Sequence, residues 1–125
     1  MSFLGIDIGT KMIKTAIIDV NGNIASRSSV DIYHLVQRPQ PSWAQRDVNQ
    51  LWEYIKKALS QLNRLNEIEA VCVDATSGTI VPIDEKGNPL YPALMYSDER
   101  AIKEAEELKR KSKKAVEFEK FLPIA

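Results

Sequence analysis

The chain has 125 residues, which is enough for one domain with its own core but not comfortably for two. Its 17 basic and 17 acidic residues give no net charge at pH 7, so the composition does not indicate a polyanionic partner such as nucleic acid. The chain has no apolar run near the roughly 20 residues of a membrane span, no signal-peptide pattern and a single cysteine, Cys72; these features indicate a reducing, cytoplasmic compartment, with no membrane partner and no intrachain disulfide.

Residues 4–19 are predicted to form two short strands joined by a tight turn at Gly9 and Thr10. Both runs are rich in β-branched side chains and are too short for helices. Glycine at the reversal permits a positive φ and lets a ligand approach the backbone closely. Asn21-Gly22 then predicts a hairpin to a third strand, from Ile24 to about Ile32, which completes an antiparallel meander.

The first predicted turn carries groups that suit a metal-bound phosphate. Asp7 stands at the end of an apolar strand, where a carboxylate is costly unless it meets a cation or hydrogen-bond donors. The nearby polar positions offer backbone donors, a hydroxyl and two ammonium groups: Gly9, Thr10, Lys11 and Lys14. Such an acid can hold Mg²⁺ through water while the donors hold phosphate oxygens. A plain β-hairpin with a polar turn explains these residue types equally well.

A polar segment with prolines at positions 39 and 41 is predicted to be a loop, and we assign no role to His34, which precedes it. An amphipathic helix is then predicted to begin at the cap Asp47, with Gln50 at the capping-box position. The apolar residues of this helix recur at helical spacing and should pack on the core: Val48, Leu51, Trp52, Ile55, Ala58, Leu59, Leu62 and Leu65.

Ile68 to Asp74 is almost continuously apolar, which predicts a central strand covered on both faces, with Cys72 buried in it. Small and polar residues follow it from Ala75 to Thr79, and a loop of this kind can bring backbone groups close to a ligand at the end of a strand. An ordinary turn is an equally good interpretation of that loop. Residues 80–84 are predicted to form an edge or irregular strand, because Pro82 interrupts them.

A second helix is predicted from Ser97, as its cap, to Lys114. The basic cluster at residues 109–114 has acidic residues on both sides, so we interpret it as a solvated helix end rather than a nucleic-acid site. Beyond it, four apolar residues have little left to pack on: Phe118, Phe121, Leu122 and Ile124.

Three of these stretches, in this order, resemble the FGGY family of carbohydrate kinases, and the likeness covers residues 2–103. Leu4 to Asp19 resembles the family's first phosphate hairpin. Trp43-Ala44-Gln45-Arg46-Asp47, together with Trp52, resembles the family's W-x-E-Q-D-P stretch and the tryptophan that follows it. Val73 to Leu90 and then Leu94 to Arg100 resemble the sugar-site loop and its W-x-D-x-R sequel.

The resemblance implies phosphoryl transfer from ATP to a sugar hydroxyl, with ATP and Mg²⁺ as cofactors and a small sugar as the partner. Asp7 would orient the metal, and Gly9, Thr10, Lys11 and Lys14 would position the phosphates. Seven further residues would line or brace the sugar site: Ala75, Thr76, Ser77, Gly78, Tyr96, Asp98 and Arg100. The loop after Asp74 is unlike the glycerol kinase and usual xylulokinase forms and closer to the ribulokinase type. It favours a ketopentose such as xylulose or ribulose, or a related polyol.

The sequence departs from the family pattern at two aligned positions and in length. Gln45 stands where an acid is usual, and Tyr96 stands where tryptophan is usual, although a tyrosine ring can still face a sugar. Family members are several times longer, and their catalytic base is an aspartate in a later segment that has no counterpart here. The resemblance therefore implies that residues 1–125 are the N-terminal part of the first kinase domain, without a catalytic residue, and do not turn over alone.

The fold implied is an α/β layer of the ribonuclease H-like, actin-like ATPase kind, a mixed sheet with flanking helices that is cut short. Such a truncated sheet should leave an edge or apolar face uncovered, which predicts a homo-oligomer such as a dimer. A non-catalytic, actin-like nucleotide-binding or interaction module is the alternative function. A hexokinase-like or activator ATPase is disfavoured by the stretches at Trp43–Asp47 and Tyr96–Arg100.

Overall fold

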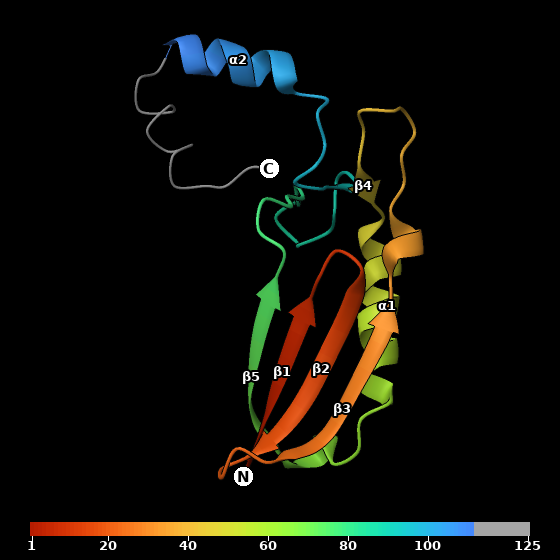
Figure 1. Cartoon of the computed structure of the whole chain (residues 1–125), viewed down its shortest axis with the longest axis vertical. Coiled ribbons are helices and arrows are strands. Elements are labelled where there is room, and N and C mark those ends of the chain that lie inside the picture. The colour runs from red at the N-terminus through yellow and green to blue at the C-terminus, as the bar shows by residue number, and fades with distance from the viewer. Residues whose placement is uncertain (112–125) are drawn as a thin grey trace.

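The computed structural model describes residues 1–111, so the predictions for residues 112–125, including the apolar run from Phe118, lie outside the described residues. The elements follow one another as β1 (Ser2–Ile8), β2 (Met12–Asp19), β3 (Ile24–Asp31), the 3₁₀ turn η1 (Tyr33–Leu35), β4 (Gln45–Arg46), α1 (Val48–Ser60), the 3₁₀ turn η2 (Leu65–Glu67), β5 (Ile68–Ala75), β6 (Ala93–Leu94) and α2 (Ile102–Lys111). Figure 1 shows their arrangement.

Four strands form one mixed sheet in the order β3-β2-β1-β5. β1, β2 and β3 pair antiparallel as the predicted meander, and β5 returns parallel to β1 after the helix α1 (Figure 1). The short strands β4 and β6 form a separate antiparallel ribbon. This confirms the predicted mixed sheet with an antiparallel beginning, and it brings the ends of β1 and β5 side by side.

The core lies between α1 and one face of the sheet. Alternation along the strands directs Leu4, Ile6, Ile13 and Ile17 toward the helix, and Ile55 and Ala58 of α1 pack against them. A polar link crosses the same interface, because the Ser28 hydroxyl donates to the Ala58 carbonyl at 2.7 Å and so accepts from Thr15 at 2.8 Å. The carboxylate of Asp47 accepts hydrogen bonds from Asn49 and Gln50 and confirms the predicted start of the helix.

The opposite face of the sheet is open within residues 1–111. A depression of about 690 Å³ lies on it, and its lining includes Gly5, Asp7, Lys14, Arg27, Cys72 and Asp74. Cys72 is exposed rather than buried, so that prediction is wrong. β5 is likewise wrongly predicted as a covered central strand, because among the described residues it is an edge strand with Val71 56 % and Val73 58 % exposed.

The first helix is shorter than the sequence pattern predicts, and the second begins later. α1 ends at Ser60, and the chain reverses through Arg64, which has a left-handed φ of 65°, to reach β5. Leu62 continues the apolar spacing and is buried without being helical. α2 begins at Ile102 rather than after Ser97, because Asp98 is held in a turn by its bonds to neighbouring loops. None of the described residues of α2 is buried.

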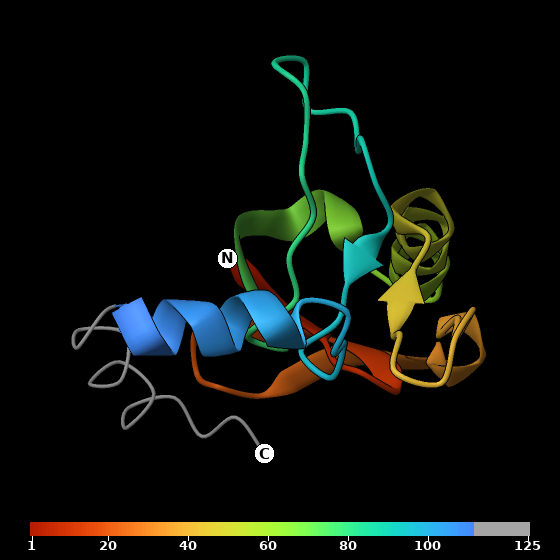
Figure 2. The same ribbon diagram turned by 90° about the horizontal axis from the view of Figure 1, so that it is seen from above.

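The segment between β5 and β6 extends away from the sheet, as Figure 2 shows. The predicted strand at residues 80–84 forms only isolated bridges there, from Ile80 to Leu94 and from Ile83 to Pro89. Elsewhere, His34 contacts Tyr54 through Nε2 and the phenol oxygen at 2.8 Å, which ties η1 to α1. No helix within the described range is long and apolar enough to cross a bilayer.

Candidate functional site

The turn between β1 and β2 is closed by its own backbone. The Gly9 amide donates to the Met12 carbonyl at 3.0 Å, and a Cβ on Gly9 would lie only 3.1 Å from that oxygen. A side chain at this position would therefore press against the turn's own backbone. The Gly9 backbone is not left-handed, so the turn does not use the positive φ that glycine permits.

Asp7 lies at the end of β1 and faces the open depression. It pairs in register with Lys14, whose ammonium lies 3.8 Å from the carboxylate. The Asp7 side chain is 47 % exposed, so this ion pair is partly screened by water and both groups remain accessible to a ligand. In the parallel direction Asp7 pairs with Asp74 of β5, so the two acidic residues lie on neighbouring strands.

The loop after β5 is joined directly to the first turn. The Thr76 amide donates to the Ile8 carbonyl at 3.2 Å, and the Thr76 and Thr10 hydroxyl oxygens are 3.4 Å apart. These two threonines are 66 residues apart in sequence. The parallel pairing of β1 with β5 therefore unites the predicted phosphate turn with the predicted sugar loop.

Gly78 and Tyr96 connect this loop to the segment after β6. Gly78 has a φ of +75°, and a Cβ there would lie 3.1 Å from the Cβ of Tyr96. The Tyr96 side chain is 45 % exposed, so its ring is available beside the loop. Ala75 ends β5, and its amide donates to the Asp74 carboxylate. Ser77 is exposed next to Gly78.

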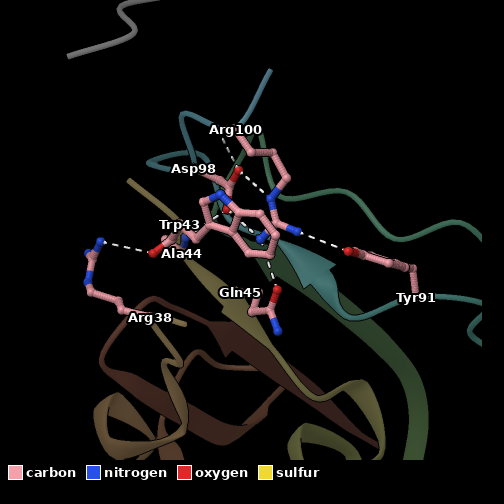
Figure 3. A network of polar contacts seen from close by, with 7 residues as sticks. All are labelled: Arg38, Trp43, Ala44, Gln45, Tyr91, Asp98 and Arg100. Atoms are coloured by element: carbon pink, nitrogen blue, oxygen red, sulfur yellow. Dashed lines mark hydrogen bonds and ion pairs between the residues drawn. The ribbon is translucent and has the colours of Figure 1, made fainter. Parts of the chain in front are cut away.

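Asp98 and Arg100 form an ion pair that holds two loops together, as Figure 3 shows. The Asp98 side chain is only 4 % exposed and accepts hydrogen bonds from the Ala44 amide at 2.7 Å and from the Arg100 guanidinium at 2.8 Å. The hydrogen bonds from Arg100, joined by that from Ala44, outweigh burial and lower the pKa of Asp98 to about 2.

Arg100 contacts three further side chains around it (Figure 3). Its guanidinium lies over the Trp43 ring at 3.9 Å from the centroid and donates to Gln45 Oε1 at 2.8 Å and to the Tyr91 hydroxyl at 3.2 Å. Gln45 stands where an acid is usual in the family that the sequence resembles, and it still accepts a hydrogen bond from Arg100. Because its donors are engaged in this way, the described geometry of Arg100 is that of a brace between segments.

Lys11 is a predicted phosphate-site residue whose ammonium lies at η1. Its ammonium lies over the ring of Tyr33, 5.9 Å from the centroid, toward η1. Among the residues of the described chain, no group of three or more His, Cys, Asp or Glu side chains could enclose a metal ion. A metal would therefore rely on one or two carboxylates and on its other ligands.

Arg46 lies at the candidate site, and the sequence interpretation did not include it. It follows Gln45 in β4, is 5 % exposed, and donates from Nη2 to the Thr10 carbonyl at 2.6 Å. Arg46 also lines a cleft of about 190 Å³ together with Gly9, Thr10 and Thr76. A single arginine before a helix cap is usually solvated, so the local pattern holds no signal of its burial.

Comparison with known proteins places this geometry in a family. Residues 2–122 match the model of the N-terminal domain of the FGGY family of carbohydrate kinases. A glycerol kinase of Aquifex aeolicus is 31 % identical over 101 residues, which cover 78 % of this chain and 20 % of that protein. A probable L-xylulose kinase of Haemophilus influenzae is 32 % identical over 127 residues, covering 98 % of this chain and 25 % of the relative.

Solved structures agree on the fold. A xylulose kinase from Rhodospirillum rubrum superposes with a TM-score of 0.78 at 24 % identity, over 90 % of this chain and 24 % of that one. Plasmodium falciparum glycerol kinase with ADP gives a TM-score of 0.70 at 22 % identity, over 89 % and 23 %. These likenesses confirm the predicted actin-like kinase fold. The chain spans about a quarter or less of the length of these relatives.

Proposed function

The chain belongs to the FGGY family of carbohydrate kinases, and from this membership we propose that it contributes the phosphate-binding and sugar-binding part of an ATP-dependent sugar kinase. The observation that carries the proposal is the junction between the first turn and the loop after β5, where Thr10 and Thr76 are 3.4 Å apart. Phosphoryl transfer needs the phosphate and the accepting hydroxyl next to each other, and this junction joins one segment suited to each.

On the phosphate side, Asp7 would hold Mg²⁺ through water, and Gly9, Thr10 and Lys14 would position phosphate oxygens. The fit rests on a half-exposed carboxylate beside an ammonium and on a turn where a Cβ would lie 3.1 Å from the Met12 carbonyl oxygen. Mg²⁺ commonly binds through one or two carboxylates and substrate phosphates, so a single acid suits it. When bound with ATP, the metal would neutralise phosphate charge. Lys11 would have to leave the Tyr33 ring to take part.

On the sugar side, the loop would present Ala75, Thr76, Ser77 and Gly78 to the substrate, with Tyr96 offering a flat ring. Asp98 and Arg100 would act by bracing that wall, since their polar atoms already bond to loops on both sides. We infer a ketopentose such as xylulose or ribulose, or a related polyol, from the residues of this loop. The matched relatives include both glycerol and xylulose kinases at similar identity, so identity alone does not choose between them.

We further propose that the 125-residue chain by itself does not turn over and that it self-associates. The first expectation follows from the family resemblance, which assigns the catalytic base to a segment outside this match. The second follows from the exposed apolar side chains of β5 and the open sheet face. A coupled ATP assay with pentuloses tests the first, and steady turnover above background would contradict it.

Calorimetric titration with Mg²⁺·ATP tests the phosphate role. Asp7→Asn should weaken binding about tenfold, because the metal loses its anionic ligand. Asp31→Asn is the matched control, since Asp31 lies on β3 and an amide can still accept its hydrogen bond from the Tyr33 amide. Equal affinities for wild type and Asp7→Asn would contradict the role of Asp7. ATP binding without any sugar binding would favour the alternative, a non-catalytic nucleotide-binding module.

A further inference from the structure

Arg46 is a buried cation without a counter-ion in the described part of the chain. Arg46 is only 5 % exposed, and its Nε atom is buried without any hydrogen-bond partner. Its one hydrogen bond runs from Nη2 to the neutral carbonyl of Thr10. Burial lowers the pKa of Arg46, although arginine stays charged at neutral pH. An unpaired buried charge is costly, so such a residue calls for an anionic partner.

The cleft beside Arg46 is small and carries several hydrogen-bond donors. Its volume is about 190 Å³, and no acidic residue lines it. Besides Arg46, the polar part of the lining has three threonines, Thr10, Thr76 and Thr79, whose hydroxyls can donate to an anion. Arg46 stands on β4, whereas the threonines belong to the first turn and to the loop after β5. Three separate segments therefore converge on one small cleft, where the guanidinium and the hydroxyls stand among the apolar residues Ile8, Leu51, Ala75, Ala93 and Met95.

We propose that Arg46, with the threonines of this cleft, binds a phosphoryl group between the phosphate turn and the sugar loop. This inference rests on the proposed kinase function for the origin of the phosphoryl group. The planar guanidinium suits two oxygens of one phosphate, and its Nε is buried without a partner in the described residues. A carboxylate on an acidic sugar shares this chemistry, so the experiment compares the two.

Arg46 has a plainer role as well, because it holds the Thr10 carbonyl. A glutamine could hold that carbonyl with an amide, so Arg46→Gln separates the brace from the charge. Arg46→Lys keeps the positive charge but loses the planar guanidinium, which can donate to two oxygens at once. Arg38→Gln is the matched control, since Arg38 is exposed and lies outside the cleft.

The probe is inorganic phosphate, titrated into the full chain while amide signals are followed by NMR at constant ionic strength. Wild type should show saturable shifts at Thr10, Thr76 and Thr79. Arg46→Gln should bind phosphate at least about tenfold more weakly, with Arg46→Lys intermediate and Arg38→Gln unchanged. A folded Arg46→Gln with wild-type affinity, or a wild type without shifts at these amides, would overturn the proposal. If Arg46→Gln does not fold, the proposal is tested by the wild-type titration alone, that is, by the presence or absence of shifts at these three amides.

Two further titrations distinguish a phosphate site from a carboxylate site, and the proposed phosphate site from the proposed kinase function. Gluconate is titrated as a carboxylate without phosphate, and binding of gluconate but not phosphate would overturn the phosphoryl assignment. Mg²⁺·ATP is titrated into wild type and Asp7→Asn. If the chain binds phosphate through Arg46 but never binds Mg²⁺·ATP, the result supports the proposed phosphate site and contradicts the proposed kinase function. If Asp7→Asn weakens Mg²⁺·ATP binding but Arg46→Gln does not change it, the proposed phosphate site is wrong and the proposed kinase function stands.

Discussion

Asp98 keeps its charge in an almost fully buried position because donors surround it. Its carboxylate accepts from the Ala44 amide and from the backbone and guanidinium of Arg100. Its pKa falls from 3.8 to about 2 on folding. A depressed carboxyl pKa stabilises the folded state above the unfolded value, and this contribution is lost as the pH falls through the folded value.

Asp98→Asn should therefore reduce stability at neutral pH by about 1–2 kcal/mol, after allowance for solvent screening of the pair. The wild type should lose this advantage as the pH falls from 3.8 towards 2, so the two free energies of unfolding converge there. Urea denaturation at a series of pH values measures the difference. A gap that stays constant down to pH 2 would show that the charge of Asp98 is not responsible.

Gly78, in the predicted sugar loop, has a left-handed backbone conformation and lies close to Tyr96. Gly78→Ala should destabilise the protein by about 1–2 kcal/mol for the left-handed φ, and by more for the contact with Tyr96. Gly87→Ala is the control, because Gly87 has a φ of +83° but open space around its Cβ position. Thermal unfolding of the pair isolates the Tyr96 contact, and equal losses would mean that this contact carries no energy.

The sequence pointed to part of the candidate site and did not point to the rest. Asp7, Thr10 and the 75–78 loop could be predicted because the apolar strands that carry them have strong local patterns. The burial of Arg46 and the turn of Lys11 toward Tyr33 depend on residues far away in sequence, which local pattern does not record. The same limit explains Cys72, whose apolar neighbours predict burial but whose strand has an open face.

At the scale of elements, the start of α1 depends on a single side chain. Asp47→Ala should cost about 1 kcal/mol, because two amides of the first turn lose their acceptor, whereas Asp47→Ser should retain most of the stability. Glu53→Ala is the control on the same helix, since its ion pair with Lys56 is exposed and worth little. Urea midpoints give the comparison. A larger loss for Glu53→Ala than for Asp47→Ala would contradict this account of the cap.

Elements with a local signal were predicted well. The meander follows from β-branched runs and from Asn21-Gly22, whose Gly22 has a φ of +83°. The end of α1 was predicted too late, because Leu62 is buried from a loop at what looks like the next helical position. α2 begins late because the bonds of Asp98 hold the preceding residues in a turn, a tertiary effect that overrides capping preference.

For the whole molecule, the sheet is covered on one side only within residues 1–111. α1 packs across β2 and β3 and leaves β5 at the edge, as Figure 1 shows. Val71 and Val73 pair in register with the core residues Leu4 and Ile6, so β5 extends the apolar face beyond the helix. An unpaired edge with exposed valines is a template for a second chain, and zero net charge opposes association weakly.

The 125-residue chain should therefore self-associate through β5. Val73→Lys should shift the average mass toward the monomer, because a charge on the edge strand blocks edge pairing. Ile24→Lys is the control, since Ile24 is 59 % exposed on β3, at the opposite edge of the sheet. Sedimentation velocity over a range of concentrations measures both. A monomeric wild type at high concentration would exclude self-association, and an equal effect of Ile24→Lys would assign it to exposed apolar surface in general rather than to β5.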